Sequence, residues 1–144
     1  GIDLGLEFYA SQDLSFYANY SYISNNVFEN VPIKGGDGAT ETTSVSAPQN
    51  KIRLGGNYAT AKGLRANLSI QYDESFMALL GQFSGETGDR TVVDLGLGYK
   101  FNDMITFGVS AQNLFDKKYR VFPLFPQIGR RVLATLTFNF GGDK

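Results

Sequence analysis

Residues able to do covalent or acid–base chemistry are few in this chain of 144 residues, which has no His and no Cys. Without an imidazole or a thiolate, the chain cannot form a Ser-His-Asp triad, a Cys-His dyad or a Cys/His zinc site. Paired carboxylates remain as conceivable general acid–base groups, but the sequence places no two of them in a recognisable pocket. We therefore assign no catalytic residue and no cofactor, and we expect that the protein is not an enzyme.

Metal ions and nucleic acids are also poorly matched by the charged residues. Asp37 with Glu41, and Glu86 with Asp89, could bind a hard cation such as Ca²⁺, but neither pair has the spacing of an EF-hand loop. The 13 Lys and Arg residues against 14 Asp and Glu give a net charge of −1, whereas nucleic-acid binding favours a strongly basic domain. We expect no metal site and no nucleic-acid partner.

Seven segments alternate apolar and polar residues with a period of two, the pattern of a β-strand with one apolar and one polar face. No window has the helical period, and no run of about 18 apolar residues offers a transmembrane helix. The pattern predicts an all-β protein, an antiparallel meander of about seven strands. The segments are residues 2–10, 14–22, 51–58, 64–73, 93–101, 105–112 and 132–140.

The predicted connections alternate between short and long. Residues 11–13, 61–63 and 102–103 are tight turns made of residues such as Ser, Asp, Asn and Gly. Residues 24–49, 74–90 and 116–129 are long connections. Short turns at one end and long loops at the other are typical of an outer-membrane β-barrel, whose short turns face the periplasm.

The alternation alone does not say which face meets lipid. Three features favour lipid on the apolar side: the polar face mixes Gly with charges, no Lys or Arg stands in the middle of an apolar face, and an aromatic girdle is predicted near the short turns from Tyr58, Tyr72, Tyr99 and Phe101. A charge at the bilayer midplane costs roughly 2–4 kcal/mol, which explains such an absence. The alternative is a soluble lipocalin-like binder that holds an apolar ligand inside.

The C-terminal part of the sequence resembles the end of a TonB-dependent outer-membrane receptor. The resemblance rests on the stretch from Val109 to Tyr119, VSAQNLFDKKY, on the pair Gly129-Arg130, and on a final strand that ends at the aromatic residue Phe140. It implies a 22-stranded barrel in the bacterial outer membrane that imports ferric siderophores, haem, cobalamin or glycans. The implied partners are outer-membrane lipid, the rest of the receptor barrel, a plug domain, and TonB through an N-terminal part missing here.

Seven is an odd number of strands, whereas single-chain bacterial barrels have an even number. We therefore expect residues 1–140 to be the C-terminal segment of a receptor barrel and residues 141–144 to be a short tail. The alternative is a small self-contained outer-membrane β-barrel with a structural or adhesive role. That barrel would need an eighth strand within residues 24–49.

Two sets of residues are candidates for the functional surface. The charges on the polar face are predicted to face the lumen, where they pair with one another or with the plug, and Arg53, Arg65, Asp94 and Lys100 represent them. Aromatic side chains on the long loops are possible substrate contacts, because binding groups concentrate on loops held by a rigid scaffold: Phe28, Phe76, Phe83, Tyr119, Phe122 and Phe125. An open alternative is that the last three pack their loop onto itself or form an outer girdle, and that residues 76–80 extend the preceding strand.

Overall fold

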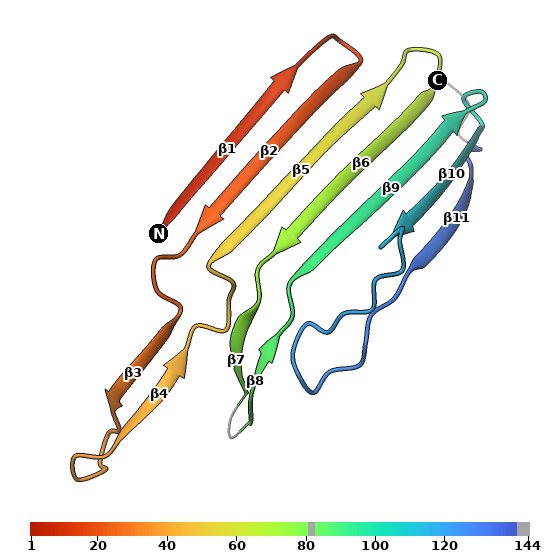
Figure 1. The fold of residues 1–144 in the computed structure, drawn as a ribbon. Helices are drawn as coiled ribbons and strands as arrows, with labels where there is room; N and C mark the ends of the chain where they lie inside the picture. Colours follow the sequence, from red (N-terminus) through yellow and green to blue (C-terminus); the bar gives the residue numbers. More distant parts are fainter. Residues whose placement is uncertain (81–82, 141–144) are drawn as a thin grey trace.

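The computed structural model describes residues 1–80 and 83–140 of the chain. It is an all-β structure built around one sheet of seven antiparallel strands in the order β1-β2-β5-β6-β9-β10-β11 (Figure 1). This confirms the predicted meander. The strands are β1 (Ile2–Tyr9), β2 (Leu14–Tyr22), β5 (Asn50–Ala59), β6 (Leu64–Asp73), β9 (Arg90–Lys100), β10 (Ile105–Gln112) and β11 (Arg131–Phe138).

The short turns all lie at one end of the sheet and the long connections at the other (Figure 1). In the turn after β5, the Gly63 amide donates to the Thr60 carbonyl at 3.0 Å, and Gly63 adopts a φ of +92° that glycine takes without strain. In the turn after β9, Asn102 Oδ1 accepts from the amides of Met104 and Ile105 at 2.9 and 2.8 Å. These local bonds fix two of the three hairpins that the sequence predicts.

Strand register gathers the apolar side chains of the sheet on one face. Leu68 stands opposite both Gly56 and Leu95, and Leu97 stands opposite Val109. Residues directly opposite one another on neighbouring strands point to the same face. The alternation within each strand is thereby extended across the whole sheet, which has one apolar and one polar face.

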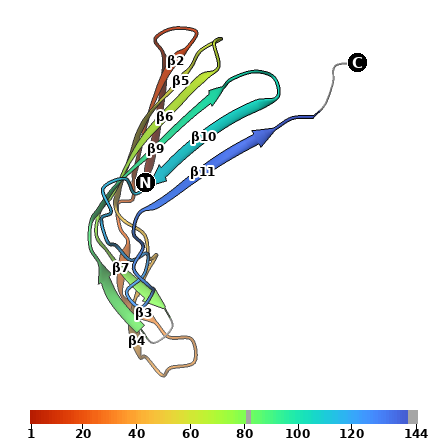
Figure 2. The same cartoon turned by 90° about the vertical axis from the view of Figure 1, so that its right-hand side faces the viewer.

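The apolar face is not covered by any other part of the chain that the structure describes. Leu54, Leu68, Leu97 and Leu136 are 44, 43, 51 and 54 % exposed, and Ala78 is the one fully buried residue among the Ala, Val, Ile, Leu, Met, Phe and Tyr residues described. Seen after a quarter turn, the sheet is a single curved layer with no second layer packed on it (Figure 2). The lipocalin-like alternative, in which this face would form an enclosed interior, is therefore wrong.

Two small hairpins extend from the long-loop end of the sheet. The first pairs β3 (Val27–Pro32) with β4 (Thr40–Ser44), and the second pairs β7 (Phe76–Leu80) with β8 (Phe83–Thr87). Each forms a separate two-stranded sheet. The predicted alternative of an eighth strand within residues 24–49 is therefore wrong, because the strands found there do not join the seven-stranded sheet. Residues 141–144, the predicted tail, lie outside the described residues.

Side chains of one hairpin bind the backbone of the other. Ser44 Oγ donates to the Met77 carbonyl at 2.7 Å, and the Leu79 amide donates to Ser46 Oγ at 3.0 Å. Serine hydroxyls thus replace part of a backbone ladder between the two hairpins. The segment at 76–80 is consequently a strand of its own that pairs with β8, and not a continuation of β6 in the main sheet.

The described part of the chain contains no helix with the length and apolar character needed to span a membrane.

The aromatic residues lie at both ends of the sheet. Tyr58, Tyr99 and Phe101 lie near the short turns as predicted, and the rings of Tyr99 and Phe101 meet edge to face at 4.9 Å. The prediction for Tyr72 is wrong, because it is the penultimate residue of β6 and stands opposite Thr91 at the long-loop end. β6 runs away from the short turn that precedes it, so its last residues lie at the long-loop end of the sheet.

Candidate functional site

The loop between β10 and β11 is fixed at its start by Asn113. This residue is 3 % exposed and has a φ of +54°, a conformation that Asn tolerates better than most residues. Its amide donates to Asp94 Oδ1 at 2.8 Å, its Nδ2 donates to the Lys117 carbonyl at 2.8 Å, and its Oδ1 accepts from the Lys117 amide at 3.0 Å. The side chain of Asn113 therefore closes the first turn of the loop and attaches that turn to β9.

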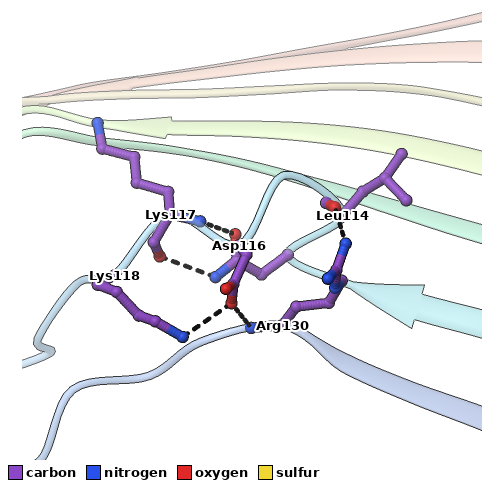
Figure 3. A network of polar contacts seen from close by, with 6 residues as sticks. Leu114, Asp116, Lys117, Lys118 and Arg130 are labelled. Atoms are coloured by element: carbon purple, nitrogen blue, oxygen red, sulfur yellow. Dashed lines mark hydrogen bonds and ion pairs between the residues drawn. The ribbon is translucent and has the colours of Figure 1, made fainter.

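Asp116 connects the start of this loop to its end (Figure 3). Its Oδ1 accepts from the Arg130 amide at 2.6 Å and from Lys118 Nζ at 2.9 Å, and Arg130 in turn donates to the Leu114 carbonyl at 3.3 Å. The hydrogen bond from the Arg130 amide, followed by that from Lys118, lowers the pKa of Asp116 below its ordinary value of 3.8. We call Asp116, Lys118 and Arg130 the Asp116 cluster.

A buried ion pair connects the wall of the sheet to the same loop. Arg90 Nε donates to Asp73 Oδ2 at 2.6 Å, Arg90 Nη2 forms an ion pair with the same oxygen at 2.5 Å, and Gln71 Nε2 donates to it at 2.6 Å. Asp73 is 2 % exposed, and its Oδ1 has no hydrogen-bond partner among the described residues. The guanidinium carbon of Arg90 also lies 5.1 Å from the centre of the Tyr119 ring, within the range of a cation–π contact.

These contacts border a cavity of about 420 Å³ on the polar face at the long-loop end. Gln71, Arg90, Asp94 and Arg131 line it from the strands, and Tyr119 and Ile128 line it from the loop. Tyr119 and Ile128 are joined by a backbone bridge, with the Ile128 amide donating to the Tyr119 carbonyl at 2.7 Å. The cavity offers two guanidinium groups, a carboxylate and an aromatic ring, which suit a ligand that accepts hydrogen bonds and presents a flat face.

The six predicted aromatic contacts do not meet at one place. Tyr119 lines the cavity, whereas Phe122 and Phe125 contact each other with ring centres 5.5 Å apart. Phe28 in β3 and Phe83 in β8 are 42 and 62 % exposed, and Phe76 is half-buried in β7. The contact between Phe122 and Phe125 agrees with the alternative that the third loop packs on itself. Substrate contact by any of the six residues stays a prediction.

The four predicted lumen charges share the polar face. Arg53 stands opposite Gln71, Arg65 opposite Gly98, and Asp94 accepts from the Asn113 amide. Lys100 instead donates to Asp103 Oδ1 in a short turn at 2.6 Å, a hydrogen bond that lowers the pKa of Asp103. Their common face is established by the register, whereas their exposure to a lumen stays a prediction.

Several residues of the cavity were not identified from the sequence. Arg90 and Gln71 meet Asp73 because Asp73 ends β6 and Arg90 begins the neighbouring β9, directly opposite it. The signal was a pair of opposite charges flanking the second long connection, and it becomes visible only when the register is known. Among the residues described, no group of three Asp, Glu, His or Cys residues could hold a metal ion.

The amphipathic sheet with an exposed apolar face, short turns at one end and long loops at the other defines an outer-membrane β-barrel protein. A family model described as "TonB dependent receptor-like, beta-barrel" matches residues 1–114. The chain belongs to this family, and its place is the bacterial outer membrane. The family consists of transporter receptors.

Individual relatives agree with this assignment. The 47 kDa outer membrane protein of Pasteurella multocida (strain Pm70) is 27 % identical over 106 residues, which cover 72 % of this chain and 25 % of that protein. The siderophore receptor PiuA from Acinetobacter baumannii matches with a TM-score of 0.69 and 16 % identity, over 94 % of this chain and 21 % of PiuA. A mutant of the ferric enterobactin receptor PfeA from Pseudomonas aeruginosa matches with a TM-score of 0.66 and 14 % identity, over 96 % and 22 %.

The chain thus spans about a quarter of the curated relative and about a fifth of these solved receptors. At identities of 14–16 %, the likeness to the solved receptors establishes the fold alone.

Proposed function

We propose that this chain supplies part of the wall and of the extracellular loops of a receptor that imports a siderophore, another metal complex or a glycan across the outer membrane. The observation that supports this most is the open amphipathic sheet. Within the described residues, β1 and β11 each pair with one neighbour, and the apolar face of the sheet is bare. Unpaired strand edges are too costly in hydrocarbon, so further strands must complete the barrel beside both edges.

The cavity beside the β10–β11 loop is the proposed contact region for the substrate within this chain. Arg90, Arg131 and Tyr119 bring hydrogen-bond donors and an aromatic face to the long-loop end, which in an outer-membrane barrel faces the outside. The exposed aromatic residues of the two hairpins would extend this surface. The names of PiuA and PfeA, both receptors for siderophores, favour a ferric siderophore as the substrate class.

The polar face is the proposed contact for a plug domain, and energy from TonB would enter through that domain. Of the charges predicted to line the lumen, Arg53, Arg65 and Asp94 have no ion pair among the described residues, whereas Lys100 pairs with Asp103. The first three are therefore able to pair with groups outside this chain.

Uptake by the full receptor in living cells tests the proposal. Cells that express it would be supplied with radioactive iron as a ferric catecholate or a ferric hydroxamate siderophore, and with a labelled oligosaccharide, in the presence and absence of TonB. We expect TonB-dependent uptake of at least one probe, lowered several-fold by Tyr119→Ala and by Arg131→Ala. Lys62→Ala, in an exposed short turn, is the matched control and should leave uptake unchanged. Uptake that is independent of TonB, or equally unaffected by all three substitutions, would contradict the proposal.

A further inference from the structure

The apolar face of the sheet is hollowed where two of its smallest residues adjoin. Gly56 stands opposite Leu68, and Tyr58 stands opposite Ala66, so Gly56 and Ala66 are diagonal neighbours on β5 and β6. Bulky side chains surround them and leave a hollow of about 380 Å³ with an almost entirely apolar lining. We call this hollow the apolar groove; its floor and walls include Phe16, Leu54, Gly56, Tyr58, Ala66 and Leu68.

A second, separate apolar hollow of about 320 Å³ lies obliquely across the sheet from the groove. It has Leu54 as a common wall with the groove and Ala18 of β2 among its lining residues. Ala18 stands opposite Leu54, so Ala66, Gly56 and Ala18 follow one diagonal over three adjacent strands. Two such diagonal steps span about 15 Å.

The position of the groove indicates which leaflet it meets. Tyr58 and Ala66 lie next to the short turn that joins β5 and β6, so the groove occupies the short-turn half of the apolar face. Short turns of outer-membrane barrels face the periplasm.

We propose that the apolar groove binds one acyl chain of a phospholipid from the periplasmic leaflet of the outer membrane. A void on a lipid-facing surface loses dispersion contacts unless an acyl chain fills it, and the small side chain of Ala66 lets the chain approach the backbone of β6. Gly56 is not the residue to alter, because Cδ1 of Phe16 lies 3.0 Å from where a Cβ would stand. Ala66 is the better choice, since a longer side chain there would occupy the groove itself.

Native mass spectrometry of the full receptor in detergent, with added palmitoyl phosphatidylethanolamine, tests this binding. The unaltered receptor should retain one phospholipid after loosely held lipid has been removed, and Ala66→Leu should lower that retention by about tenfold. Ala134→Leu is the matched control, because Ala134 lies on the same face in β11 and lines neither hollow. Equal retention by all three proteins, or an equal loss in both variants, would overturn the proposal, as would retention of lipopolysaccharide in place of phospholipid.

A second measurement needs no substitution and so does not depend on the folding of a variant. The unaltered receptor in vesicles of phosphatidylethanolamine with a photoreactive acyl chain would be irradiated and digested with trypsin. We expect labelling of peptides 54–62 and 66–90 to exceed that of peptide 132–144 several-fold. Even labelling of these peptides would show that no acyl chain is held at the groove. Neither measurement depends on transport, so each can fail while the proposed import function stands.

Discussion

The buried charge of the Asp73 carboxylate is compensated at Oδ2 by the Arg90 guanidinium and by the Gln71 amide. Removing a partner of a buried ion pair leaves an uncompensated charge, at a typical cost of 3–5 kcal/mol. We expect Arg90→Gln to cost about 3 kcal/mol of unfolding free energy, the low end of that range, because the Arg90 side chain keeps 22 % exposure. The measurement is unfolding of the purified full receptor in denaturant. The double variant Asp73→Asn, Arg90→Gln removes both charges and should be more stable than Arg90→Gln; a double variant that is less stable would contradict this reading.

Asp116 holds the two ends of the β10–β11 loop together through its Oδ1. In Asp116→Ala we expect several-fold faster trypsin cleavage of the full receptor on intact cells, because Lys117, Lys118 and Arg120 stand in the released loop. Asp116→Asn keeps an acceptor and tolerates the φ of +55°, so its cleavage should stay close to that of the unaltered receptor. Equal cleavage of the Ala and Asn variants would show that the hydrogen bonds of the Asp116 cluster do not hold the loop.

The ionised Asp116 also makes the loop sensitive to acid. Its pKa is lower in the folded loop than its ordinary value of 3.8, so the contribution of the carboxylate to loop stability is complete above that value. It is lost as the pH falls through the lowered pKa of the folded state. Cleavage by an acid-active protease should therefore rise in that acidic range in the unaltered receptor and less in Asp116→Asn. An equal rise in both would assign the acid sensitivity to other groups.

The short turn between β5 and β6 requires a glycine at position 63. A Cβ on Gly63 would stand 2.5 Å from the Lys100 carbonyl oxygen, and its φ of +92° disfavours any side chain. We expect Gly63→Ala to cost about 1–3 kcal/mol of unfolding free energy. Gly88→Ala is the control, since a Cβ there would meet no atom within 4 Å. Denaturant unfolding of the full receptor compares the two, and a cost at Gly88 as large as that at Gly63 would contradict the steric account.

The sequence predicts the seven-stranded sheet well because one face of each strand is apolar over its whole length. Segments such as Leu64–Asp73 hold the period of two for ten residues, and the tight turns between them are rich in turn formers. The same pattern does not predict the two hairpins at the long-loop end. Thr40–Ser44 is polar throughout, so its pairing with Val27–Pro32 leaves no alternating signal.

The candidate site was less predictable than the sheet. Asp73 and Arg90 are 17 positions apart and meet only through the register of β6 and β9. Asn113 and Asp116 stand in the stretch that resembles the receptor family. Their side chains accept from the backbone amides of Lys117 and Arg130, and residue types alone do not predict which backbone amides a side chain will bind. Tyr72 was assigned to the wrong end because its position relative to the turns, and not its type, decides where it lies.

At the scale of the whole molecule, the proposed function requires one face of the sheet to contact lipid and the other to contact water. The leucines of the apolar face would be buried in the acyl chains, while the charges and amides of the polar face meet the watery interior of the completed barrel. This chain contains no Cys, so single cysteines can report on each face separately.

The most direct measurement is cysteine labelling, with a charged, water-soluble maleimide, of the full receptor in native outer membranes after any cysteine outside this chain has been replaced by serine. Asn57→Cys and Ser69→Cys sample the polar face, and Leu54→Cys and Leu68→Cys sample the apolar face of the same two strands. We predict rapid labelling of the first pair and several-fold slower labelling of the second. Equal rates, or faster labelling at positions 54 and 68, would contradict the orientation of the sheet.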